Sequence, residues 1–248
     1  MNVFRKLLLA ALPALAVLGI GASSATAFPC VPTTYSQDAM PLTAALINPP
    51  DSLVPENLDA SGCDIGIFYD VGSGSHVLRD KNVFGARYYG VLSRGKGVIT
   101  KLVHSSVFDI GNKPHDGSQH GIAVAWREGA AGGLDSSQLY DYQKGGVLAD
   151  GAGTNVQVTG NVVRGLGPVP FIAQNGVQVS RGATGDVNGN FIEDHEYTGC
   201  SKADAKATGC TYTESTGILL FQVDETLVDT SNNTYRNNDI NLFNGSNL

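Results

Sequence analysis

Residues 155–163 read NVQVTGNVV, and residues 185–192 read GDVNGNFI. In both stretches apolar and polar residues alternate over a few positions, a Gly-Asn pair follows, and two apolar residues come after it. Alternation with a period of two is typical of β-strands, and Gly and Asn tolerate the left-handed backbone angles that tight turns need. Each stretch therefore predicts two short strands joined by a tight turn.

The same pattern recurs along the chain. Its first part is a glycine followed by apolar or small residues, found at Gly66, Gly90, Gly121, Gly146, Gly176 and Gly217. Its second part is an Asn or Ser followed by two mostly apolar residues, found at Asn82, Ser106, Ser137, Asn161, Asn190 and Asn233. The second part comes 14 to 16 residues after the first in all six copies. So regular a spacing indicates a structural repeat.

Three short strands per repeat fit this pattern, because a further apolar element precedes most of the Asn or Ser turns. No segment between the strands has the helical periodicity that a crossover helix needs. The chain must therefore wind into coils that stack each strand on the same strand of the next coil, about 4.8 Å away. We expect an all-β solenoid in which turn Asn side chains bond the neighbouring coil.

Residues 155–163 and 185–192 resemble the repeats of the pectate-lyase-like superfamily, and the resemblance covers roughly residues 62–244. It implies a single-stranded right-handed parallel β-helix of about six or seven coils in one domain. The superfamily contains polysaccharide lyases, hydrolases, uronate epimerases, phage tailspikes and members without known activity, so the fold does not specify the chemistry. His115-Asp116 is similar to part of the Asp-Pro-His-Asp motif of mannuronan epimerases, but Lys113 stands where the first Asp would be. We therefore carry over no role from that motif.

The composition agrees with a folded, turn-rich β protein. The chain has 248 residues, with 31 Gly, 16% charged and 42% hydrophobic residues, which excludes a collagen, a coiled coil and a disordered tail. Its 16 Lys and Arg against 23 Asp and Glu give a net charge of -7. A protein that binds phosphate backbones needs an excess of cations, so we do not expect nucleic acid as a partner.

The first 27 residues have the pattern of a secretory signal peptide. Arg5 and Lys6 precede an apolar run over residues 7–20, and small residues at 25–27 suit a signal peptidase. The alternative is a membrane anchor, but the run of about 14 residues is shorter than the roughly 20 that span a bilayer. We expect residues 28–61 to pack on or cap the solenoid and residues 62–248 to form it. The mature protein would be a secreted, extracellular monomer without membrane attachment.

Four cysteines follow the leader, and an even number in an exported chain indicates disulfides, although four cysteines allow three pairings. We favour Cys30 with Cys63, which would hold the N-terminal segment, and Cys200 with Cys210, which would close a loop poor in apolar residues. The alternative is a zinc site. The chain has no CxxC pair, and the spacings fit no structural zinc pattern, so we predict no metal ligands among the cysteines.

Strand alternation predicts which residues of the Asn- or Ser-led strand face outward. If the second residue after each Asn or Ser points into the core, the third points out. The outward positions are then Gly85, Asp109, Tyr140, Arg164, Glu193 and Arg236. The connecting segments beside this polar row vary most in length and carry His115, His120, His195 and Tyr197. Variable loops along one edge of a solenoid often form its binding face.

The Gly-led strand has a different outward row. Alternation gives Phe68, Leu92, Ala123, Leu148, Gln178 and Leu219. An apolar row of this length does not face water alone, so we expect residues 31–60 or another segment to cover it.

The polar row suggests a groove for a uronate-containing polysaccharide. Arg164 and Arg236 would bind a sugar carboxylate, and Tyr140 and Tyr197 would contact the sugar rings. The expected catalytic residues are Asp109, Arg164, Glu193, His195 and His115. Lyases of the superfamily commonly use an Arg or Lys base with calcium held by carboxylates, so the resemblance leaves calcium open as a cofactor.

Other interpretations stay open at the level of the sequence. Arg164, Glu193 and Arg236 can form a salt-bridge ladder between coils, worth up to about 1 kcal/mol per exposed pair. His115 and His120 can be a general base, a metal pair or parts of a solvated turn. Three function classes compete: an enzyme of lyase or epimerase type acting on extracellular polysaccharide, a non-catalytic glycan-binding or surface protein, and a structural component.

Overall fold

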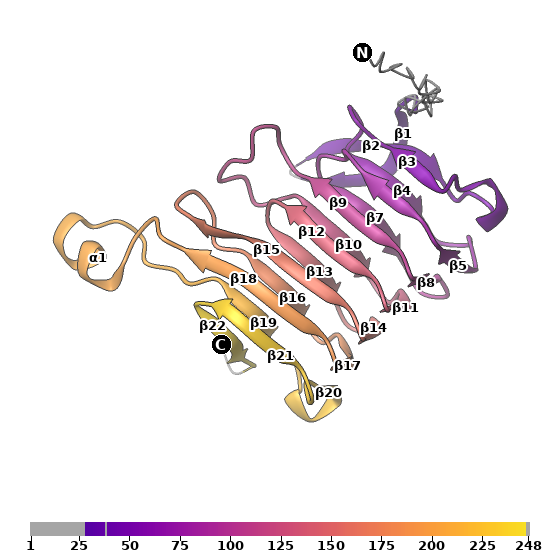
Figure 1. Cartoon of the computed structure of the whole chain (residues 1–248). Helices are drawn as coiled ribbons and strands as arrows, with labels where there is room; N and C mark the ends of the chain where they lie inside the picture. The colour runs from indigo at the N-terminus through magenta and orange to yellow at the C-terminus, as the bar shows by residue number, and fades with distance from the viewer. Residues whose placement is uncertain (1–27, 38, 247–248) are drawn as a thin grey trace, which may run out of the picture.

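The computed structural model describes residues 28–37 and 39–246, so the predicted signal peptide lies outside the described residues. Three sheets run side by side along one axis (Figure 1). Sheet A contains β1 (Val31–Gln37), β2 (Met40–Ile47), β4 (Ile65–Tyr69), β7 (Tyr89–Arg94), β10 (Ile122–Arg127), β13 (Gly145–Asp150), β16 (Asn175–Ser180), β19 (Thr216–Phe221) and β22 (Ile240–Gly245). Sheet B contains β3 (Asn57–Asp59), β6 (Asn82–Phe84), β9 (Ser106–Ile110), β12 (Gln138–Tyr142), β15 (Val162–Val169), β18 (Phe191–Tyr197) and β21 (Thr234–Asn238). Sheet C contains β5 (Ser75–Arg79), β8 (Ile99–Val103), β11 (Ala131–Asp135), β14 (Asn155–Thr159), β17 (Thr184–Asn188) and β20 (Val228–Asp229).

The connections between these strands form a solenoid. The chain passes from sheet A to sheet C, then to sheet B, and returns to sheet A one coil further along. All strand pairs are parallel except β1 with β2, which form an antiparallel hairpin. Among the described residues the one α-helix is α1 (Lys202–Thr208), which projects in the loop between β18 and β19 (Figure 1). The predicted all-β parallel solenoid is confirmed.

A row of Asn and Ser side chains fixes the turn between sheets C and B. The Asn161 Oδ1 atom accepts a hydrogen bond from the Ser137 N–H at 2.9 Å, and Asn190 Oδ1 accepts one from the Asn161 N–H at 3.0 Å. Asn233 Oδ1 continues the row by accepting from the Asn190 N–H at 3.0 Å. Ser137, Asn161 and Asn190 are buried, so each bond satisfies a backbone donor away from water. The predicted bonding between turn Asn residues of neighbouring coils is confirmed.

In the first coils this row starts one residue earlier than predicted. The Ser105 Oγ atom accepts from the Lys81 N–H at 3.2 Å, and the Ser105 N–H donates to Ser137 Oγ at 3.0 Å. Lys81 and Ser105 therefore occupy the turn positions, and Asn82 and Ser106 begin the next strands. The outward residues of β6 and β9, which were counted from the turn, therefore lie one residue earlier than predicted.

Glycines in the strands of sheet A are needed because their Cα atoms approach the next strand closely. A Cβ atom at Gly176 would lie 2.5 Å from the Gly217 carbonyl oxygen and 2.8 Å from the Ile192 side chain, so no larger residue fits without movement. In β10 this position belongs to Ala123, because the register of β10 with β7 places Gly121 before the strand. The predicted repeat is thus offset by two residues in this copy.

The β1–β2 hairpin covers the outward apolar row of sheet A near the N-terminal end. Tyr35 of β1 packs with Phe68, Leu92 and Ala125 in a core cluster outside the solenoid. Ala123, which was predicted in this row, is buried in the inner core instead. The error follows from the two-residue offset in β10.

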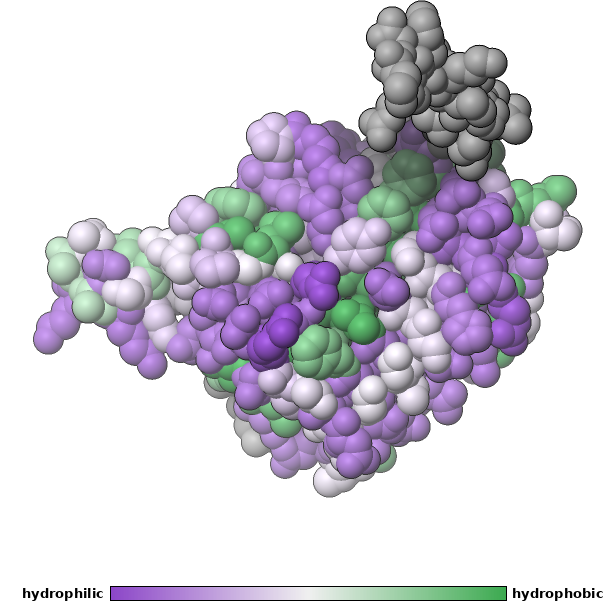
Figure 2. All heavy atoms as spheres, in the orientation of Figure 1, coloured by the Kyte–Doolittle hydropathy of each residue, from purple (hydrophilic) through white to green (hydrophobic). Residues whose placement is uncertain are grey.

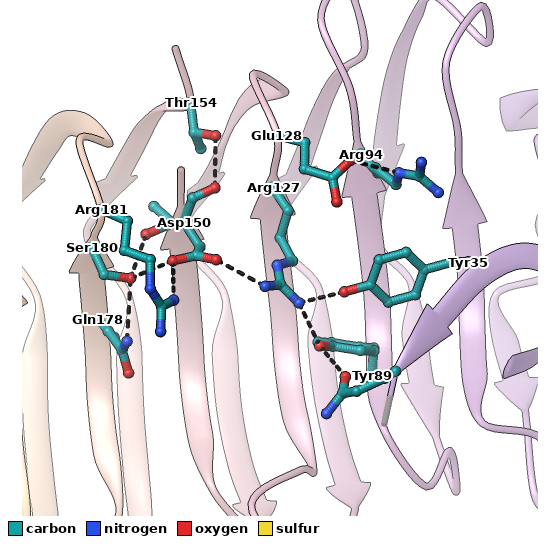
Figure 3. A network of polar contacts seen from close by, with 12 residues as sticks. Tyr35, Tyr89, Arg94, Arg127, Glu128, Asp150, Thr154, Gln178, Ser180 and Arg181 are labelled. Atoms are coloured by element: carbon teal, nitrogen blue, oxygen red, sulfur yellow. Dashed lines mark hydrogen bonds and ion pairs between the residues drawn. The ribbon is translucent and has the colours of Figure 1, made fainter. Parts of the chain in front are cut away.

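Polar contacts fasten the hairpin to the solenoid (Figure 3). The Arg127 guanidinium donates hydrogen bonds to the hydroxyl groups of Tyr35 and, at 3.2 Å, of Tyr89. It also donates to Asp150 Oδ2 at 2.9 Å. A side chain of β10 therefore joins the hairpin to the next coil.

Both predicted disulfides are present. Cys30 bonds Cys63, which ties the start of the described chain to the segment before β4, and Cys200 bonds Cys210, which closes the loop that contains α1. These pairs leave no thiol for the alternative zinc site. Within residues 28–37 and 39–246, no helix is both long and apolar enough to cross a membrane.

Candidate functional site

The outward row of sheet B is the part of the predicted site that the structure places in line. The strand register aligns one residue from each successive strand, and these residues are Phe84, Phe108, Tyr140, Arg164, Glu193 and Arg236. We call them the sheet B row. Gly85 and Asp109, which alternation predicted for this row, are wrong by one residue because the Lys81 and Ser105 turns come earlier than expected.

Two arginines share one carboxylate at the C-terminal end of the sheet B row. Arg164 Nε donates to Glu193 Oε1 at 2.6 Å, and Arg236 Nη2 donates to Glu193 Oε2. The Glu193 side chain is 0% exposed, whereas the side chains of Arg164 and Arg236 are 53% and 57% exposed. The guanidinium group of Arg236 also lies 5.4 Å from the Phe191 ring centroid. The cluster therefore presents two positioned cations to solvent over one buried anion.

Three aromatic rings stack at the other end of the row. The Phe84 and Phe108 centroids are 5.1 Å apart with planes 14° from parallel, and the Phe108 and Tyr140 centroids are 4.9 Å apart with planes 3° from parallel. These distances match the spacing of strands in a sheet, so the rings lie face to face along the solenoid. One face of the Tyr140 ring is thus covered by Phe108, and Arg164 is the next residue of the row, on the neighbouring strand. Figure 2 shows this side of the molecule, where apolar and strongly hydrophilic surface adjoin near its centre.

His195 is not part of this surface. It is buried in the solenoid, on the opposite side of β18 from the outward row. His195 Nε2 lies 2.5 Å from the Tyr142 hydroxyl oxygen, and Nδ1 lies 2.8 Å from Asn238 Oδ1. Burial lowers the pKa of His195 to about 4 despite the hydrogen bond to Asn238, so the ring is neutral at pH 7. The expectation that His195 joins Arg164 and Glu193 in one patch is wrong. His195 belongs to β18 and not to a loop, and its side chain is buried.

Asp109 and His115 meet in a separate cluster around the loop between β9 and β10. Lys113 forms ion pairs with Asp109 and, at 3.5 Å, with Asp141. His115 Nε2 lies 2.9 Å from Asp141 Oδ1, and His115 Nδ1 lies 3.0 Å from the Asn112 carbonyl oxygen. Among residues 28–37 and 39–246, no side-chain hydrogen bond or ion pair joins this cluster to the side chains of the sheet B row. Asp141, which lies directly after the outward Tyr140, was not recognised in the sequence as part of a site.

Tyr197 lies at the far end of β18, beside the loop that contains α1. Its N–H donates to Asp239 Oδ2 at 2.8 Å, and its side chain helps to line a surface depression with Lys202 and Tyr212. This position separates Tyr197 along the strand from Glu193, where the outward row crosses β18. Tyr197 therefore belongs to the loop edge rather than to the sheet B row.

The carboxylates of Asp109, Glu193 and Asp194 each have a different partner. Asp109 pairs with Lys113, Glu193 with two arginines, and Asp194 Oδ1 accepts from Asn237 Nδ2 at 3.0 Å. Among the described residues no group of three or more His, Cys, Asp or Glu side chains is arranged to hold a metal ion.

A second ionic cluster, on the outer face of sheet A, was not recognised in the sequence (Figure 3). Asp150 accepts from Arg127 at 2.9 Å, from Arg181 Nη1 at 2.6 Å and from Ser180 Oγ at 2.8 Å. Burial opposes ionisation of Asp150, but these hydrogen bonds outweigh it, so the pKa of Asp150 is lowered. Arg127 pairs in register with Asp150, but the two-residue offset of the repeat in β10 hides this alignment in the sequence.

In comparisons with known protein families, curated proteins and solved structures, no match to this chain was found.

Proposed function

We propose that this protein is exported and binds an acidic, uronate-containing polysaccharide outside the cell along the sheet B row. The observation that carries the proposal is the fixing of Arg164 and Arg236 by the one buried carboxylate of Glu193. A guanidinium that is already positioned loses less conformational entropy when it binds an anion. The two disulfides fit an oxidising compartment.

Charge favours an acidic ligand at this place. The local cluster has two cations and one anion, although the whole chain carries a net charge of -7. Arg164 uses Nε and Arg236 uses Nη2 for Glu193, so further N–H groups of both side chains remain for a carboxylate. The ring edges of Phe84, Phe108 and Tyr140 extend the same surface with apolar area, which suits the C–H groups of a sugar chain.

Binding is better supported at this row than turnover. His195, the expected proton-transfer group, is buried on the other side of the strand, and both oxygens of Glu193 accept hydrogen bonds from arginines. Asp109 and His115 form their own cluster with Lys113 and Asp141. Arg164, the base expected of a lyase, is engaged in an ion pair with Glu193, and none of the other predicted acids or imidazoles contacts the two arginines.

Equilibrium binding to a panel of polysaccharides tests the proposal. The secreted protein is titrated with polygalacturonate, alginate and a neutral β-glucan, and the double variant Arg164→Gln/Arg236→Gln is compared with Arg79→Gln. Arg79 is an exposed arginine on sheet C and serves as the matched control. We expect binding of the uronate polymers that weakens with salt, falls at least about tenfold in the double variant and persists in Arg79→Gln.

Equal binding of neutral and acidic polymers, or unchanged binding by the double variant, would contradict the proposal. The same samples are followed for unsaturated products at ultraviolet wavelengths and for new reducing ends. Product formation that depends on Arg164 would establish the enzymatic alternative at this row.

A further inference from the structure

A cavity of about 370 Å³ lies on the outer face of sheet A, lined by residues of β19 and β22 and of the segment between α1 and β19. Leu219 and Phe243, which are paired in register, form part of its apolar lining. Lys144, Tyr212 and Glu214 contribute polar groups. The volume is in the range of sites for small organic molecules.

The apolar lining of the cavity belongs to the outward apolar row of sheet A. The N-terminal hairpin covers this row in the first coils. Phe68 and Leu92 are buried under Tyr35 at one end of sheet A. Leu219 and Phe243 occupy the equivalent outward positions at the other end and are only partly buried. The cavity therefore exposes apolar surface that is covered in the first coils.

Lys144 is a largely buried cation at the edge of this cavity. Its Nζ atom donates a hydrogen bond to the Ala173 carbonyl oxygen at 2.7 Å. No ion pair joins Lys144 to a carboxylate within residues 28–37 and 39–246. Burial lowers the pKa of Lys144 to about 8, so the ammonium form still predominates at pH 7. A desolvated ammonium with N–H groups to spare is stabilised by an anionic ligand.

The loop that carries α1 forms one side of the cavity and is held by contacts within itself. The Tyr212 hydroxyl donates to Glu214 Oε1, and Lys202 Nζ lies 5.1 Å from the Tyr212 ring centroid. The Cys200–Cys210 disulfide closes the same loop. Glu214 places one negative charge at the cavity, which disfavours a ligand with two negative charges.

We propose that this cavity binds a small organic monocarboxylate, with the carboxylate at Lys144 and an apolar body on Leu219 and Phe243. The site is on sheet A and is independent of the polysaccharide surface proposed on sheet B. It accounts together for the desolvated ammonium of Lys144, the partly exposed side chains of Leu219 and Phe243, and the contacts of Tyr212 with Glu214 and Lys202.

Ligand-observed NMR and calorimetry with 3-phenylpropanoate test this site in the full secreted protein. The neutral isostere 3-phenylpropanamide and the dianion phenylsuccinate are the comparison ligands. We expect the monocarboxylate to bind at least about tenfold more tightly than either. Its affinity should fall as pH rises through about 8, because Lys144 then loses its charge while the probe stays anionic.

Variants separate Lys144 from Glu214, which also lines the cavity, and from Lys202, which lies over the Tyr212 ring. Lys144→Met keeps the aliphatic stem and should lower affinity at least about tenfold, whereas Lys144→Arg should remove the fall in affinity above pH 8. Lys101→Met, on exposed sheet C, is the matched control and should bind as the unaltered protein does.

Equal affinity for the acid and the amide in the unaltered protein, or no binding of any probe, would overturn the proposal even if Lys144→Met failed to fold. The Arg164→Gln/Arg236→Gln variant should retain 3-phenylpropanoate binding, and Lys144→Met should retain polysaccharide binding. The two binding activities are therefore measured independently, and either proposal can fail while the other holds.

Discussion

The outer faces of sheet A and sheet B place similar ionic groups in different surroundings. On sheet A, Asp150 accepts from Arg127 under the N-terminal hairpin, and these side chains are 7% and 24% exposed. On sheet B, Glu193 is bonded by two arginines that are both more than half exposed. The difference comes from the β1–β2 hairpin, which packs on the outer face of sheet A and whose Tyr35 hydroxyl accepts a hydrogen bond from Arg127.

Burial from solvent determines how much an ion pair contributes to the stability of the protein. A buried pair is costly to break, because removal of one partner leaves the other without solvent or a counterion. An exposed arginine is solvated whether or not its partner is present, so its pair contributes little to stability and its N–H groups stay available to a ligand. Sheet A should therefore be sensitive to mutation in stability, and the sheet B row should be sensitive in binding.

Asp150→Ala should have the largest effect on stability. It removes the acceptor of Arg127, Arg181 and Ser180 and leaves Arg127 with the hydroxyls of two tyrosines. We expect the free energy of unfolding, measured by urea denaturation, to fall by about 3 kcal/mol or more.

The exposed carboxylate Asp186 on sheet C provides the control, since Asp186→Ala should change the unfolding free energy by less than about 0.5 kcal/mol. Glu193→Ala should cost about 1 kcal/mol, because it frees two solvated arginines. If Asp150→Ala and Glu193→Ala destabilised the protein equally, the contrast between covered and open faces would be lost.

The stability of the protein should depend on pH through His195, the buried residue of β18. The folded-state pKa of His195 is about 4, below the value near 6.5 of an exposed His, so the unfolded chain binds more protons between these values. Stability from this group is complete above pH 6.5 and decreases as the pH falls toward 4, by up to about 3 kcal/mol in total. Urea denaturation at several pH values measures this loss.

His195→Gln isolates that contribution from the carboxylates that titrate over the same range. The difference in unfolding free energy between the unaltered protein and the variant should shrink as the pH falls from 6.5 to 4. A constant difference across this range would mean that His195 titrates as an exposed imidazole does.

Arg164→Ala should have only a small effect on stability and sharpens the contrast with Asp150. The Arg164 side chain is 53% exposed, and Glu193 keeps Arg236 as a partner, so we expect a loss of no more than about 1 kcal/mol. Binding of uronate polymers should nevertheless weaken. A large loss of stability without a change in binding would assign the cluster to a salt-bridge ladder alone.

The repeat was readable in the sequence because its turns use particular residues. Asn161 and Asn190 sit where a buried backbone N–H of the neighbouring coil needs an acceptor, and the sequence spacing located both correctly. Ser105 and Ser106 are adjacent and chemically alike, so the sequence could not tell which one occupies the turn. Alternation turned that one-residue ambiguity into the wrong outward residue, Asp109 in place of Phe108.

The candidate sites were less predictable than the coils. Arg164, Glu193 and Arg236 were placed correctly because they follow turns whose Asn residues were correctly identified. His195 was assigned to a loop because nothing in the sequence marks how far β18 extends, and the structure continues that strand to Tyr197. The Asp150 cluster and the Lys144 cavity depend on the hairpin and the α1 loop, which lie outside the repeat.

The solenoid, the Asn turns and the two disulfides could all be predicted from the amino-acid sequence, because each depends on local backbone requirements or on cysteine pairing that leave a readable pattern. Tertiary packing, in contrast, controls which faces are covered, which ionic groups are buried and where a cavity forms. These properties arise when non-repeating segments such as the β1–β2 hairpin pack on the coils. Such packing depends on contacts between residues far apart in the chain, and no local spacing encodes it.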